Sequence, residues 1–269
     1  MGQLITINDQ NYEAFIDHVG DDGQQRKRGL IPRDYKKNPV GSYAAAQEEF
    51  PDSLLIPEGD YGDWIAEQEK MQSSLQHIRD KGNDGKPIPP KDQDGVGYCW
   101  IHSGTMAMEL VRALNNEPFV QLAAFMAGCL IKGYRDEGGN GIEGPEFFAV
   151  NGICTEQFWP EKSMKRSNDT PEMRKNAAMH KCLRWWDTSD NSAKRKRQVI
   201  SASLRSWPVI ADFNWWGHSV LLIRVLSIMK SRILNSWGQW GDNGIGDLEN
   251  GKAWPDNACI PCVESASTV

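Results

Sequence analysis

The chain has 269 residues, of which 39% are hydrophobic and 25% charged, and these near-average proportions exclude a disordered, collagen-like or disulfide-dense protein. Thirty lysines and arginines against 36 acidic residues give a net charge of −6, which argues against a nucleic-acid partner. The least interrupted apolar stretch, residues 119–131, is shorter than the roughly 20 residues that span a bilayer, so we expect no membrane partner. The N-terminus lacks the pattern of a secretory signal, so we expect a cytoplasmic, reducing environment.

The six cysteines are scattered over a chain long enough to bury a core without disulfides. Cys259 and Cys262 form a single Cys-x-x-Cys pair with no second pair and no histidine partner, which argues against a zinc site. We expect reduced thiols, with this pair packed in the C-terminal tail, and neither a metal nor an organic cofactor.

The composition divides the chain near residue 52. Residues 1–52 are polar, charged and rich in glycine and proline, and the segment 24–35 (QQRKRGLIPRDY) is basic and turn-rich. Because this arm has too few periodic apolar residues to bury a core of its own, it must pack on something else or stay mobile. We expect either the main domain, residues 53–269, or a neighbouring subunit to hold it, so that homo- or hetero-assembly through the arm is one prediction.

Helical patterns dominate the first part of the domain and strand patterns the last part. Helices are predicted at residues 65–81, 99–114, 120–132, 171–186 and 194–206. Short β-branched or apolar runs bounded by turn residues predict strands at 208–213, 219–226 and 231–234. This order predicts an α+β protein with two subdomains.

Cys99 lies where a glycine-rich loop meets a predicted helix. Unpaired amides and the macrodipole at a helix N-terminus favour a thiolate, which predicts a lowered pKa. Gly95 and Gly97 leave space above the sulfur, and Gln93 and the Cys99 backbone N–H could together form an oxyanion hole. The alternative interpretation is a buried structural cysteine beside a flexible loop.

A thiolate nucleophile needs a base that also donates a proton. His218 is the best candidate because it opens an apolar strand, from whose end its ring would project rigidly; His102, on the helix of Cys99, is the alternative. Asn235 ends the next strand and could accept the second ring N–H of His218, with Trp237 covering that bond from water. The remaining histidines are expected to be surface or helix residues: His18, His77 and His180.

Three of these segments, in this order, resemble the signature segments of papain-like cysteine peptidases. They are residues 93–100 (QDGVGYCW), 217–220 (GHSV) and 235–244 (NSWGQWGDNG). Weaker resemblances are to the glycine shelf of the family, at Gly138 and Gly139, and to the start of the mature enzyme, at residues 56–64. The resemblance covers roughly residue 54 to the end of the chain.

The resemblance implies a papain-like fold, with a helical subdomain, a β-barrel-like subdomain and the active-site cleft between them. It implies a polypeptide substrate, with Cys99 as nucleophile, His218 as base and acid, Asn235 as orienting residue and Gln93 as oxyanion donor. It also implies that residues flanking the cleft bind the substrate, with the glycines pairing to an extended peptide: Gly138, Gly139, Ser219 and Trp237.

The sequence departs from the family at two points, one related to the compartment and one to regulation. Val96 stands where the family has a disulfide-linked cysteine, which fits a reducing compartment. The arm lacks the long helical pattern of the family's inhibitory propeptide, so any regulation must differ. Two alternatives therefore stay open: a structural protein of a virus-like or other particle that docks through residues 1–52, and an acyltransferase that passes the thioester to an amine.

Overall fold

The computed structural model describes residues 3–17, 19, 20, 23, 25–70, 75–82 and 85–263. His18 lies outside these residues. The helices are α1 (Tyr61–Lys70), α2 (Leu75–Lys81), α3 (Cys99–Leu114), α4 (Ala124–Lys132), α5 (Glu143–Asn151), α6 (Pro171–Ala177), α7 (Ser192–Leu204) and the short α8 (Trp240–Asn243). The strands are β1 (Ile5–Ile7), β2 (Glu48–Glu49), β3 (Trp185–Asp187), β4 (Val209–Phe213), β5 (His218–Ser227), β6 (Lys230–Leu234), β7 (Ile245–Glu249) and β8 (Asn257–Pro261).

The helix predicted at 99–114 has those bounds, α4 lies within its predicted range, and α7 overlaps the predicted range 194–206. Of the helix predicted at 65–81, the structure describes α1 and α2, and residues 71–74 lie outside the described residues. The prediction for 171–186 was wrong in its second half. There Trp185 pairs with Pro261 of β8 and becomes part of a strand, because long-range pairing outweighs local helix propensity.

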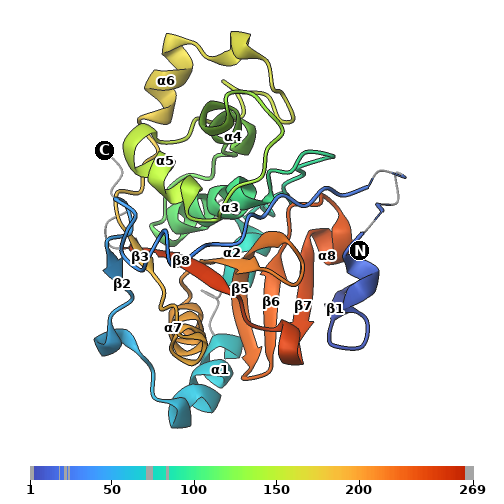
Figure 1. Ribbon diagram of the computed structural model, residues 1–269, viewed down its shortest axis with the longest axis vertical. Coiled ribbons are helices and arrows are strands. Elements are labelled where there is room, and N and C mark those ends of the chain that lie inside the picture. The colour runs from blue at the N-terminus through green and yellow to red at the C-terminus, as the bar shows by residue number, and fades with distance from the viewer. Residues whose placement is uncertain are drawn as a thin grey trace.

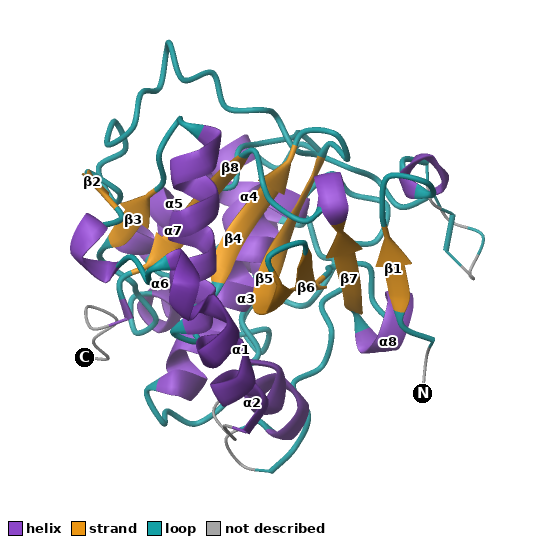
Figure 2. Cartoon of the chain, turned by 90° about the horizontal axis from the view of Figure 1, so that it is seen from below, coloured by secondary structure: helices purple, strands orange, loops and turns teal. Residues whose placement is uncertain are grey.

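Eight strands form one sheet in the order β1-β7-β6-β5-β4-β8-β3-β2, and Figure 2 shows them fanning out in this order. Alternate residues of the central strands pack on opposite faces. Ile210 and Leu221 join the core that α3 and α4 share, whereas Val209 and Val220 join a second core with α7. A helical part therefore covers one face of the sheet, so the fold is α+β, as predicted. Among the described residues, no helix is long and apolar enough to cross a membrane.

The arm packs on its own domain. β1 pairs in parallel with β7 at one end of the sheet, and β2 pairs in parallel with β3 at the other end. Between these strands the chain crosses the molecule over the start of α3, where Gly29 contacts Cys99, and Figure 1 shows it as a blue segment. The arm is thus attached to both sheet edges, and the part between them must run across the face where the two subdomains meet.

A buried ion cluster attaches the loop before α3 to that helix. Lys91 is 1% exposed, and its Nζ lies 2.8 Å from Glu109 Oε1 on α3 and 2.7 Å from Glu156 Oε1. The same Nζ donates a hydrogen bond of 2.7 Å to the Leu122 carbonyl. Because Gln93 follows Lys91 closely in the chain, this cluster also holds the segment that carries the predicted oxyanion donor.

Replacing the buried cation tests this role. We expect Lys91→Met to lower the free energy of unfolding by about 3–5 kcal/mol, because it leaves buried carboxylates without their partner. Lys194→Met is the matched control, since Lys194 pairs with Glu49 and Asp52 at the surface and should cost less than about 1 kcal/mol. Urea unfolding measures both changes, and equal losses in the two variants would contradict the assignment.

Candidate active site

Cys99 is the first residue of α3, and its side chain is fully buried. The preceding residue, Tyr98, anchors this helix end. Its hydroxyl donates a hydrogen bond of 2.7 Å to the Arg135 carbonyl, and its ring lies so close to Gly128 that an added Cβ there would come within 2.6 Å. The start of α3, and with it the sulfur of Cys99, is therefore held by packing on α4.

His218 and Asn235 come from the ends of neighbouring strands. The His218 ring is buried, and its Nε2 lies 2.8 Å from Asn235 Oδ1, which also accepts the Ser236 N–H at 2.8 Å. Because Oδ1 is an acceptor, Nε2 carries a proton and donates it. His218 Nδ1 has no hydrogen-bond partner among the residues that the structure describes, so it is the ring atom left to accept a proton.

Two tryptophans enclose the histidine. The ring centroids of Trp237 and Trp216 lie 4.5 Å and 4.8 Å from that of His218. The hydroxyl of Ser219, the residue after His218, lies 2.8 Å from that of Ser103 on α3, which places the start of β5 against the start of α3. The structure thus brings Cys99, His218 and Asn235 together, with Trp237 beside the histidine.

Gln93 lies at the same place. Its Oε1 accepts the Ser236 hydroxyl at 2.6 Å, which fixes the amide group. Its Nε2 donates to the Val96 carbonyl at 2.8 Å and to the Lys27 carbonyl at 2.7 Å. A backbone carbonyl of the arm therefore accepts a hydrogen bond from the amide that was predicted to stabilise an oxyanion.

The arm covers the sulfur itself. The Gly29 N–H donates to Cys99 Sγ at 3.3 Å, and the Leu30 N–H donates to the Gly217 carbonyl at 3.2 Å. Gly139 exchanges two backbone hydrogen bonds with the arm: its N–H donates to the Gly29 carbonyl at 2.9 Å, and its carbonyl accepts the Ile31 N–H at 2.8 Å. The arm is thus an extended peptide paired to the predicted glycine shelf.

This fit requires glycine on both sides. A Cβ on Gly29 would lie 1.8 Å from the Gly97 carbonyl oxygen, and a Cβ on Gly138 would lie 2.5 Å from the Gly29 carbonyl oxygen. Backbones approach this closely only where side chains are absent. The glycine of the arm is therefore what allows it to lie against the loop before Cys99.

The arm places different peptide groups at Cys99 and at Gln93. The amide that donates to the sulfur belongs to the Arg28–Gly29 peptide bond, whereas Gln93 donates to the carbonyl of Lys27. An attacked carbonyl must be the one that the oxyanion donors hold, with its carbon next to the sulfur. The arm therefore covers Cys99 in a register that differs from the one expected for a cleaved peptide.

The predicted lowering of the thiol pKa is wrong for this form of the protein. Burial raises the pKa of Cys99 to about 11, although the backbone amides of Ser219 and Gly29 oppose the shift. Burial likewise lowers the pKa of His218 to about 3, against the hydrogen bond to Asn235. Both groups are therefore neutral while the arm covers them, because desolvation outweighs the helix N-terminus.

The other histidines lie outside this group. His102 is buried within α3, where its Nδ1 lies 2.8 Å from the Tyr98 carbonyl, and burial lowers its pKa to about 4. His180 is also buried, with Nδ1 3.0 Å from the Ile153 carbonyl, so its prediction as a surface or helix residue was wrong. His77 lies on α2.

The cysteines are buried thiols, including Cys259 on β8 and the nearby Cys262. Among the described residues, no cluster of three or more histidine, cysteine, aspartate or glutamate side chains is arranged to hold a metal ion.

The contact of the arm with the site was not predicted from the sequence. Lys27 and Gly29 lie in the segment that was identified only as basic and turn-rich. One signal was present: a single glycine, preceded by basic residues and followed by Leu-Ile-Pro, is typical of an extended chain that approaches another backbone closely.

Solved structures of cysteine proteases share this architecture. Xylellain from Xylella fastidiosa matches 88% of this chain and 97% of its own, with 16% identity and a TM-score of 0.59. Procathepsin L 3 of Tenebrio molitor matches 94% of this chain and 78% of its own, with 15% identity and a TM-score of 0.54. The Carica candamarcensis protease CMS1MS2 covers 64% and 92%, with 17% identity and a TM-score of 0.50.

No known family profile matches the sequence, and no curated protein matches it. The likeness to the solved structures is therefore one of fold, at low sequence identity. On that basis the chain has the papain-like fold, with a helical part and a sheet that meet at Cys99.

Adding a methyl group to the arm tests whether it covers the thiol. At a pKa of about 11, roughly one Cys99 thiol in a thousand is ionised at pH 8, against roughly a quarter for a free cysteine. We expect Gly29→Ala to displace the arm and raise the rate of Cys99 alkylation by iodoacetamide at least about tenfold, as measured by peptide mapping. Gly59→Ala is the control, since a Cβ there has no neighbour within 4 Å among the described residues. Equal rates in the two variants would show that the arm does not limit access.

Proposed function

We propose that the protein is a latent cysteine peptidase of the papain-like type, which hydrolyses peptide bonds of polypeptides once its N-terminal arm leaves the cleft. The observation that carries the proposal is the group formed by Cys99, His218, Asn235 and Gln93, on which a backbone segment of the chain already lies. The low-identity likeness to cysteine proteases supports the same reaction.

The reaction begins when a substrate replaces the arm. His218 Nδ1 takes the proton of Cys99, and the thiolate attacks the carbonyl carbon of the scissile bond. Gln93 Nε2 and the Cys99 backbone N–H stabilise the oxyanion of the tetrahedral intermediate. His218 then gives its proton to the leaving amine, and a thioester remains on Cys99.

Hydrolysis of the thioester completes the cycle. A water molecule gives a proton to His218 Nδ1 and attacks the thioester carbon; the acid leaves, and the proton returns to the sulfur. Asn235 keeps the His218 ring in one orientation by accepting the Nε2–H. Trp237 and Trp216 keep water away from that bond, which favours a fixed tautomer.

The arm provides the latency. It supplies a carbonyl to Gln93, an N–H to Cys99 and a paired strand to Gly139, so it occupies the positions that a substrate needs. Its packing on its own domain also supports a pro-segment over a free docking arm of a particle protein. Residues 53–269 are then the peptidase domain, with substrate contacts at the glycine shelf, Ser219 and Trp237.

Labelling of the opened protein tests the proposal. In a Gly29→Ala background, we expect a peptidyl epoxide to modify one site, with the label lost in Cys99→Ala and slowed at least about a hundredfold in His218→Ala. Gln93→Ala should lower kcat for a fluorogenic peptide by roughly 10²–10³, because it removes one oxyanion donor. Intact mass and fluorescence measure these changes.

Matched variants and products complete this test. Cys262→Ala, which removes another buried thiol, and His77→Ala, on α2, should leave labelling and turnover unchanged. A free carboxylic acid as product indicates hydrolysis, whereas a new amide formed with an added amine indicates acyl transfer. Labelling no faster than that of a free thiol, with no turnover of any peptide, would refute the peptidase function.

A further inference from the structure

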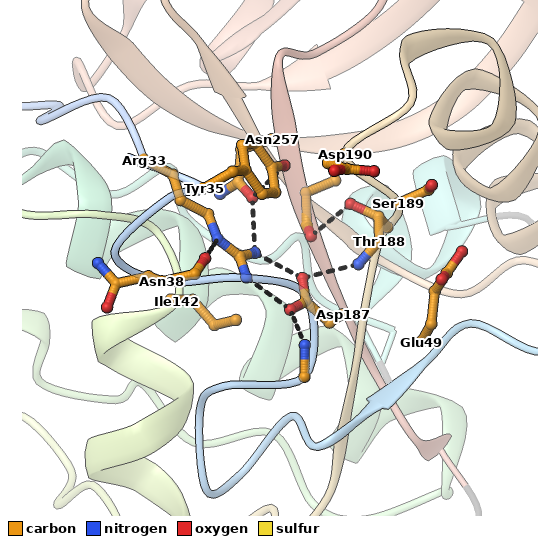
Figure 3. Close-up of polar contacts among 12 residues, drawn as sticks. Arg33, Tyr35, Asn38, Glu49, Ile142, Asp187, Thr188, Ser189, Asp190 and Asn257 are labelled. Carbon is orange, nitrogen blue, oxygen red and sulfur yellow. Dashed lines mark hydrogen bonds and ion pairs between the residues drawn. The ribbon is translucent and has the colours of Figure 1, made fainter.

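Arg33 of the arm has a buried guanidinium. The side chains of Arg33 and Asp187 are both fully buried. Arg33 Nη1 and Nη2 donate to the two carboxylate oxygens of Asp187 at 2.6 Å and 2.8 Å, and Nη1 also donates to Asn257 Oδ1 at 3.2 Å. Figure 3 shows this paired geometry, which matches the planar fork of a guanidinium and which a lysine ammonium could not reproduce.

Asp187 ends a row of polar side chains that begins at Cys99. Ser219 of β5 is opposite Asp212 of β4, and Asp212 is opposite Asn257 of β8. Asp187 of β3 is opposite Cys259, which lies on the same face of β8 as Asn257 because successive residues of a strand alternate. The four side chains therefore follow one face of the sheet from strand to strand, and Asn257 Nδ2 links to Asp212 Oδ2 at 2.8 Å.

The arm follows the same row. Gly29 lies on Cys99, Leu30 and Ile31 lie along Gly139, and Arg33 reaches Asp187. An extended peptide that occupies the cleft over Cys99 thus carries a side chain into the Asp187 position. The carboxylate is therefore within reach of any peptide bound along the glycine shelf.

The site has two halves, of which only one belongs to the peptidase domain. The arm contributes the carbonyls of Asn38 and Pro39, which accept from Arg33 Nε at 2.9 Å and Nη2 at 2.8 Å, and the rings of Tyr35 and Tyr43 beside the guanidinium. The domain contributes Asp187 and Asn257. When the arm leaves, Asp187 loses both the Arg33 guanidinium and the Gly41 N–H that donates to its Oδ2 at 2.9 Å, and a carboxylate without these partners favours a new cationic partner.

We propose that Asp187 and Asn257 form a guanidinium-binding subsite of the cleft, which Arg33 fills in the latent form and an arginine side chain of the polypeptide substrate fills in the active form. This inference rests on the proposed peptidase function and names its substrate class: polypeptides with an arginine near the scissile bond. The guanidinium can come from Arg33 of the arm or from an arginine of the substrate. One experiment tests whether the subsite binds a guanidinium, and a second tests whether a substrate provides it.

The first part measures binding without catalysis in the full chain. Arg33→Ala empties the subsite, and we expect ethylguanidinium, but not ethylammonium, to raise the melting temperature of this variant. Asp187→Asn in the same chain should abolish the rise, whereas Asp190→Asn, an exposed neighbour of Asp187, should leave it unchanged. If Arg33→Ala does not fold, Arg33→Lys replaces it, and the same selectivity is required. Equal effects of the two cations, or a rise that survives Asp187→Asn, would overturn the subsite.

The second part measures substrate choice. The chain used here carries Gly29→Ala and Arg33→Ala. Each substrate peptide has a single arginine at a different position around the scissile bond, and each is compared with the same peptide in which norleucine replaces the arginine. At one position we expect kcat/KM to favour arginine by roughly 10- to 100-fold, as charge-assisted hydrogen bonds predict. Asp187→Asn should reduce the ratio to about one by lowering turnover of the arginine peptide alone.

Failure of the arginine subsite and failure of the peptidase function give different results. Guanidinium binding with no arginine preference at any position means that Asp187 only anchors the arm, and the substrate inference is then wrong. A preference that survives Asp187→Asn overturns the inference in the same way. Failure of all peptides together with an unreactive Cys99 refutes the peptidase function, and the first part still decides whether the subsite binds a guanidinium.

Discussion

The contact between Gly29 and Cys99 is the constraint on which the rest of the site depends. Two backbones and a sulfur atom meet there without an intervening side chain, because both facing segments carry glycine at the point of approach. The contact closes the cleft from solvent. It also sets the register in which Lys27 reaches Gln93 and Arg33 reaches Asp187.

The same closure explains the chemical state of the site. A helix N-terminus and neighbouring amides favour a thiolate at Cys99, yet burial outweighs them and raises the pKa of the thiol to about 11. His218 is kept neutral by the same desolvation, with its pKa lowered to about 3. The proposed latency therefore has two physical components: the arm lies over Cys99, and burial opposes transfer of the thiol proton to His218.

The sheet connects Cys99 and His218 to the proposed subsite. Its cleft-side face is apolar where α3 packs and polar where the arm lies, so one set of strands provides both a core and a row of side chains for binding. β1 and β2 attach the arm to the two ends of this sheet. Release of the arm must therefore free the segment between two attached strands, or detach one of them, before a polypeptide can enter.

The sequence by itself determined the local framework of the site: α3 beginning at Cys99, a strand beginning near His218, and Asn235 at the end of the next strand. These features follow from periodicity and turn residues, which act over a few neighbours. Tertiary structure decided the rest. Residues 185–187 form β3 where a helix was predicted, because pairing between distant segments outweighs local preference. The position of the arm over Cys99 and the ion pair of Arg33 with Asp187 also depend on contacts between distant segments. The pKa of Cys99 is raised where the sequence predicted a lowered value, because desolvation depends on what covers the thiol.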